Sequence, residues 1–186
     1  MIYLISYLFG SILFGVIVSK CLKIGNLREE GSGNIGATNI ARVSGDKKIG
    51  ILVAVLDGLK GAVPVILARH LGFDHQVAIV GTAAVLGHLF PIWHKFKGGK
   101  GVATFLGMNL AINYTIGIKL ILIWIITFSI SKISSFASLT MVIAATLSYL
   151  WDINQLVPIA ISSLMIMIKH RDNIKRLIKG KEGKFK

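Results

Sequence analysis

Long apolar stretches separated by short polar clusters dominate this sequence and constrain its fold more than any other feature. Over 186 residues the mean hydropathy is +0.72, and 54% of the residues are hydrophobic. Soluble domains average about 45–50% apolar residues with glycine included. The composition therefore predicts an integral membrane protein, and we treat residues 1–186 as a single domain.

Apolar segments of suitable length predict an all-α, polytopic membrane helix bundle with about seven transmembrane helices. One long apolar run, 102–130, exceeds the ~20 residues that cross a bilayer, so we divide it near Asn113. The other predicted spans are 2–18, 49–67, 76–93, 139–150 and 156–168.

The positive charges follow this division of the chain. The formal net charge is +13, from 21 Lys and Arg against 8 Asp and Glu. Most of these cations fall in segments that seven spans would place on one side: 20–48, 95–100, Lys132 and the tail 169–186. Because cytoplasmic loops carry the excess of Lys and Arg, the N-terminus is predicted outside and the C-terminus in the cytoplasm. The same bias accounts for the charge without a nucleic-acid partner.

A glycine-rich polar cluster at 31–42 has the composition of an anion-binding loop. Glycines can turn backbone N–H groups to one side, and short polar side chains with an arginine add donors. The candidate residues are Gly31, Ser32, Gly33, Asn34, Gly36, Thr38, Asn39 and Arg42. The glycines also fit the dinucleotide pattern G-x-G-x-x-G, but the required preceding strand is missing. A flexible spacer is the remaining alternative.

Two further polar clusters and the start of the tail fall on the same predicted side. Lys97, Gly98, Gly99 and Lys100 combine backbone amides with point charges, although their spacing does not match a Walker A loop. The segment 131–138 is rich in serine and includes Ser135. The start of the tail contains His170 and Asn173. Their convergence on one face predicts a shared cationic pocket.

Charged residues also occur inside a predicted span. Asp57 and Lys60 are three residues apart and can pair on one helix face. Charges at such depth usually face the interior of a bundle, so a structural pair is weighed against a direct catalytic role. His88 lies near the inner end of the next span and is assigned with them as supporting the site.

The motifs together resemble the bacterial PlsY-type acyl-phosphate:glycerol-3-phosphate acyltransferases. The resemblance covers essentially the whole chain and is carried by 31–42, 57–61, 87–91, 96–104 and 170–177. It implies transfer of an acyl group from acyl phosphate to the 1-hydroxyl of glycerol 3-phosphate, giving lysophosphatidic acid and inorganic phosphate. The reaction would take place at the cytoplasmic face of the inner membrane.

The resemblance also implies roles for individual residues. The residues that it implies contact glycerol 3-phosphate are Ser32, Arg42, Lys100, Ser135, His170 and Asn173. The segment Gly98, Gly99 and Lys100 would help to hold acyl phosphate. The donor is already activated, so no metal or organic cofactor is required. The proton acceptor stays open between the phosphate of the donor and His170.

A small membrane transporter or lipid flippase is the alternative function, with Asp57 and Lys60 as ion-coupling residues. A regulatory subunit bound to acidic lipid through its tail is a third. Neither alternative requires glycine-rich anion loops on one side of the membrane.

Overall fold

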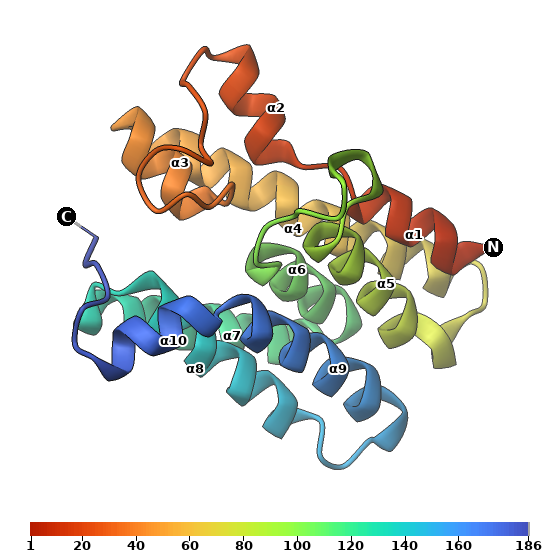
Figure 1. Cartoon of the computed structure of the whole chain (residues 1–186). Coiled ribbons are helices and arrows are strands. Elements are labelled where there is room, and N and C mark those ends of the chain that lie inside the picture. Colours follow the sequence, from red (N-terminus) through yellow and green to blue (C-terminus); the bar gives the residue numbers. More distant parts are fainter. Residues whose placement is uncertain (186) are drawn as a thin grey trace.

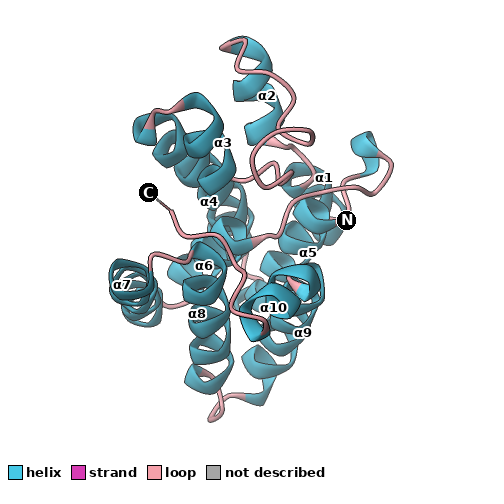
Figure 2. Ribbon diagram, turned by 60° about the vertical axis from the view of Figure 1, so that its left-hand side comes forward, coloured by secondary structure: helices cyan, strands magenta, loops and turns pink. Residues whose placement is uncertain are grey.

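The computed structural model describes residues 1–185, and over this range the regular elements are ten α-helices and two short 3-10 turns. The all-α class predicted from hydropathy is confirmed. Helices α4 (Lys47–His70) and α6 (Val102–Ile112) cross near the centre of the bundle (Figure 1). Helix α1 (Ile2–Gly10) packs on α5 (Val77–Leu89), and α7 (Tyr114–Ser131) packs on α8 (Ser134–Ser148). Viewed from another side, α10 lies across the bundle next to the ends of α6 and α8 (Figure 2).

The first predicted span is broken into α1 (Ile2–Gly10) and α2 (Phe14–Cys21), which corrects the expectation of one continuous helix over 2–18. The break has a tertiary cause. Lys60 reaches across from α4 and its Nζ donates to the carbonyl oxygen of Ile12 at 2.5 Å. A backbone group freed at membrane depth needs such a partner, and this one comes from a residue distant in sequence.

Helix α3 (Ala37–Ser44) leads into the long helix α4 (Lys47–His70), whose first turn is capped by the side chain of Asp46. Glycines allow α4 and α6 (Val102–Ile112) to approach closely. A Cβ atom at Gly61 would lie 2.0 Å from the carbonyl oxygen of Thr104, and one at Gly107 would lie 2.0 Å from that of Gly58. Small residues at such crossings are typical of membrane helices.

A turn, η1 (Asp74–Gln76), precedes α5 (Val77–Leu89), and a second turn, η2 (Ile92–His94), begins the connection to α6. The predicted division of the long apolar run is present, since Asn113 separates α6 from α7 (Tyr114–Ser131) and caps α7 by accepting from the Ile116 amide.

The last helices are α8 (Ser134–Ser148), α9 (Ile153–Lys169) and α10 (Arg171–Ile178). Helix α8 begins five residues before the predicted span at 139, so most of the serine cluster is helical rather than loop. Its serines therefore present side chains from a fixed helix face.

Four helical stretches are long and apolar enough to cross a bilayer: Ile2–Cys21, Lys47–His70, Asp74–His94 and Tyr114–Ser131. A fifth is reached if α9 and α10, which are bent by 63°, count together. Helices α6 and α8 are apolar but shorter. The total of seven spans and the side on which each terminus lies stay predictions.

Candidate active site

The polar clusters that are far apart in sequence line one cavity of about 260 Å³. Its walls come from the 32–42 segment, α4, α5, the start of α6, α7, the start of α8, the α9–α10 junction and the C-terminal segment. The lining residues from the predicted site are Ser32, Asn34, Gly36, Thr38, Asn39, Arg42, Asp57, His88, Lys100, Ser135, His170 and Asn173. Gly31, Gly33, Lys97, Gly98, Gly99 and Lys60 lie outside this lining.

Asn39 organises the glycine-rich loop. Its Nδ2 donates to the carbonyl oxygens of Leu27, Glu30 and Asn34 at 2.8–3.1 Å, and its Oδ1 accepts from the Ser32 amide at 2.7 Å. Gly31 adopts φ +62°, and a Cβ there would lie 2.3 Å from Asn39 Oδ1. The loop is thus held from within, and Ser32 is placed at the cavity wall.

Helix α3 directs its N-terminus and one cation toward the cavity. Gly36, Ala37 and Thr38 of its first turn line the wall, where the positive end of the helix dipole favours an anion. Thr38 Oγ1 lies 3.0 Å from Ser134 Oγ, which links α3 to α8. The guanidinium of Arg42 lies 5.8 Å from the centre of the Phe185 ring.

Lys100, from the loop before α6, is a second cation in the lining of the cavity. Its Nζ donates to Asn173 Oδ1 at 2.5 Å. Burial lowers the pKa of Lys100 to about 8, although the Glu182 carboxylate acts to raise it. Lys100 is therefore charged at neutral pH but close to its titration range.

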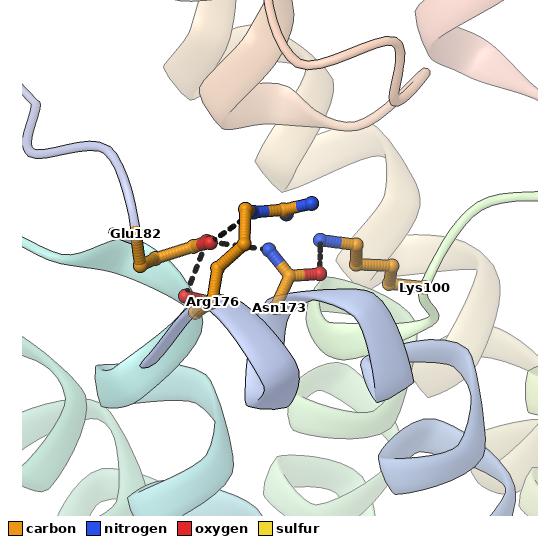
Figure 3. Close-up of polar contacts among 5 residues, drawn as sticks. Lys100, Asn173, Arg176 and Glu182 are labelled. Carbon is orange, nitrogen blue, oxygen red and sulfur yellow. Dashed lines mark hydrogen bonds and ion pairs between the residues drawn. The ribbon is translucent and has the colours of Figure 1, made fainter. Parts of the chain in front are cut away.

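Glu182 brings a carboxylate into the same cluster (Figure 3). It accepts from Ser135 Oγ at 2.8 Å, from Asn173 Nδ2 at 2.5 Å and from Arg176 Nε at 2.6 Å. Partial burial alone would raise the pKa of Glu182, but the hydrogen bonds from Arg176, Asn173 and Ser135 outweigh burial and hold it below its ordinary value.

His170 is oriented by the end of α9. Its ring is almost completely buried, and Nδ1 lies 2.8 Å from the carbonyl oxygen of Ile166. Because a carbonyl only accepts, Nδ1 carries a proton there. In the neutral ring this leaves Nε2 as an acceptor beside the cavity.

The buried charges of α4 lie at the deep end of the cavity. Lys60 Nζ is 2.7 Å from Asp57 Oδ1, and His88 Nδ1 is 3.8 Å from the same oxygen. Asp57 and His88 line the cavity, whereas Lys60 is turned to Ile12. Lys60 therefore contacts the helix break rather than the cavity.

The two glycines before Lys100 serve close packing. The Gly98 amide donates to the Leu89 carbonyl at 3.3 Å and the Gly99 amide to that of His88 at 3.2 Å. A Cβ at Gly98 would lie 1.9 Å from the His88 carbonyl oxygen. The expectation that these amides face an anion is not met, because they bond within the chain. Lys97 is exposed, and its carbonyl accepts from Arg28.

Sequence reasoning missed Glu182 and Trp124, which both line the cavity. The signal for Glu182 was available, because it is the one acidic residue among the many lysines of 173–186. Trp124 lies within a continuously apolar helix, where no pattern distinguishes it. Its Nε1 donates to Ser138 Oγ at 3.2 Å.

An apolar helical bundle with a cavity that joins cations, hydroxyls and an apolar wall defines an integral membrane enzyme acting on an anionic, lipid-like substrate. Comparison with known proteins makes this specific. Residues 1–180 match the family model described as glycerol-3-phosphate acyltransferase. The glycerol-3-phosphate acyltransferase of Bartonella henselae is 44% identical over 100% of this chain and 90% of its own length. The chain belongs to the glycerol-3-phosphate acyltransferase family.

Solved structures agree with this assignment. The glycerol 3-phosphate form of PlsY (YgiH), an integral membrane glycerol 3-phosphate acyltransferase, superposes with a TM-score of 0.93 at 39% identity. The lysophosphatidic acid form superposes with a TM-score of 0.91 at 38% identity. Each comparison covers 100% of this chain and 94% of the other.

Proposed function

We propose that this chain transfers a fatty acyl group from acyl phosphate to the 1-hydroxyl of glycerol 3-phosphate, releasing lysophosphatidic acid and inorganic phosphate. The observation that carries the proposal is that Arg42 and Lys100, from separate segments, line one cavity with an apolar wall. The similar PlsY structures in glycerol 3-phosphate and lysophosphatidic acid forms support the acceptor and the product.

The polar end of the cavity suits glycerol 3-phosphate. In this proposal Arg42, Ser32 and the first turn of α3 hold its phosphate, because cations and oriented N–H groups favour an anion. Ser135, His170 and Asn173 face the glycerol portion. The hydroxyl of Ser135 and Nε2 of His170 offer acceptors for hydroxyl protons.

The donor requires both charge and apolar surface. We assign Lys100 to the phosphate of acyl phosphate because it is a cation in the cavity lining. The same lining has an apolar part, formed by Ala54, Val102, Ala103, Leu106 and Trp124. A fatty chain can follow this wall between α4, α6 and α7. With Gly98 and Gly99 bonded internally, Lys100 is the member of that segment proposed to hold the donor.

The chemical step forms a bond between the substrate 1-oxygen and the acyl carbonyl carbon and breaks the bond from that carbon to the phosphate oxygen. We assign the hydroxyl proton to the departing phosphate, with Nε2 of His170 as the protein alternative. Lys100 stabilises the charge that develops as phosphate departs. Holding both substrates close together in one cavity supplies the remaining rate enhancement.

The proposed location is the inner membrane, with the cavity at the cytoplasmic face. Several segments that line the cavity, including 32–42, the loop before α6 and the C-terminal segment, lie in the Lys- and Arg-rich parts of the chain, which favours the cytoplasmic side.

The test is an assay of purified protein with glycerol 3-phosphate and either acyl phosphate or acyl-CoA. The proposal predicts lysophosphatidic acid and equimolar inorganic phosphate from acyl phosphate alone. Turnover with acyl-CoA only would overturn the donor assignment. A His170→Ala variant separates the proton acceptors. A higher KM with kcat retained favours the phosphate, and a collapse of kcat at saturation favours His170.

A further inference from the structure

The C-terminal segment, residues 179–185, contributes Glu182 and Gly183 to the lining of the cavity. The Phe185 amide donates to the Lys132 carbonyl at 2.7 Å, and the Phe185 ring lies 5.9 Å from that of Phe128. These contacts fix the end of the segment beside the start of α8. Glu182, between them and α10, is thereby brought to the cavity.

The Glu182 carboxylate is bound by donors from two helices. Ser135 of α8 and Asn173 of α10 both donate to Oε1, and Arg176 of α10 donates to Oε2. Only 9% of the Glu182 side chain is exposed. A carboxylate held this way is a fixed acceptor and a poor proton acceptor, because its lone pairs already have donors.

The Asn173 amide links the Glu182 carboxylate to Lys100. Its Nδ2 donates to Glu182 Oε1 at 2.5 Å, and its Oδ1 accepts from Lys100 Nζ at 2.5 Å (Figure 3). A carboxylate accepts only from the NH₂ end of an amide, so Glu182 determines that the oxygen end faces the ammonium. The reversed amide would place NH₂ against the Lys100 ammonium and the amide oxygen against the Glu182 carboxylate.

We propose that Glu182 is a positioning residue, which orients the Asn173 amide and through it holds Lys100 in place for the phosphate of the substrate. The inference rests on the proposed function and extends it to a residue that touches no substrate. It makes the C-terminal segment a working part of the active site.

The charges around Lys100 make a positioning role of Glu182 measurable through the pKa of Lys100. The groups that act on Lys100 are the carboxylates Glu182 and Asp172, the guanidiniums of Arg176 and Arg42, and the nearby His170 ring. Because Glu182 raises the pKa of Lys100, its neutralisation lets Lys100 lose its proton at lower pH. A role in folding alone would not move this titration.

The test measures kcat, KM for acyl phosphate and the pH profile of kcat/KM for acyl phosphate, with wild type, E182Q and E182D. For E182Q we expect at least a tenfold loss in kcat/KM and an alkaline limb about 0.5 pH unit lower. E182D keeps the carboxylate and should retain the wild-type limb. K181Q alters an exposed neighbour in the same segment and serves as the control.

The inference would be overturned if the alkaline limb of the pH profile of E182Q coincided with that of wild type. A shift of the K181Q profile like that of E182Q would also overturn it. If E182Q does not fold, R176Q provides the opposite test. It removes a cation that lowers the pKa of Lys100, so its limb should move to higher pH, and an unchanged limb contradicts the inference. An inactive wild type would instead contradict the proposed function.

Discussion

The ammonium group of Lys100 donates a 2.5 Å hydrogen bond to Asn173 Oδ1, which joins the loop before α6 to α10 inside the cavity. These residues are 73 positions apart in the chain. The contact unites two of the predicted polar clusters and holds a cation at the cavity wall.

The pair Lys100 and Lys97 provides a matched test of that placement. Lys100→Met should reduce kcat/KM by about 10²-fold or more, because it removes a positioned cation from a developing negative charge. Lys97→Met removes the same charge from an exposed position outside the cavity and should change kcat/KM less than threefold. Steady-state assays of both variants check the prediction, and equal losses would contradict it.

Activity should fall at alkaline pH as Lys100 loses its proton. Burial lowers the pKa of Lys100 to about 8, so the charged form predominates below that pH and is lost above it. A phosphate monoester is a dianion above about pH 6, so kcat/KM should be greatest at about pH 7, between this pKa and that of Lys100. Lys100→Arg, whose guanidinium stays charged, should lack the alkaline limb whatever its absolute rate. A limb that persists unchanged in Lys100→Arg would assign it to another group.

The buried pair on α4 should matter for stability. Lys60→Met leaves the Asp57 carboxylate and the Ile12 carbonyl without their partner. Because breaking a buried ion pair is costly, the free energy of unfolding should fall by about 3–5 kcal/mol. The double variant Asp57→Asn, Lys60→Met removes the stranded charge and should recover part of the loss. Thermal unfolding in detergent measures both. A Lys60→Met protein as stable as wild type would show that the pair does not brace the break.

The sequence was sufficient to predict the helical class, the break at Asn113 and the presence of Arg42 and Lys100 in the lining of one cavity. Hydropathy and charge bias are properties of whole segments, so they can be read from the sequence without knowing how the helices pack. The break between α1 and α2 was not predictable, because it depends on Lys60 arriving from another helix.

The same limit explains the errors at the site. Gly98 and Gly99 have the composition of an anion loop, but their amides bond to the end of α5, which only tertiary structure reveals. Glu182 lies in a tail whose basic composition indicates a membrane surface. Its position depends on contacts with Ser135 and Asn173, which come from two other helices.

The most direct test of the account is the rate of lysophosphatidic acid formation from acyl phosphate and glycerol 3-phosphate by wild type, Arg42→Ala and Lys48→Ala proteins. Arg42 lines the cavity, while Lys48 is exposed just beyond α3 and outside it. We expect turnover by wild type and Lys48→Ala, and a loss of about 10²-fold or more in kcat/KM for Arg42→Ala. Wild-type activity in Arg42→Ala, or no product from wild type, would contradict it.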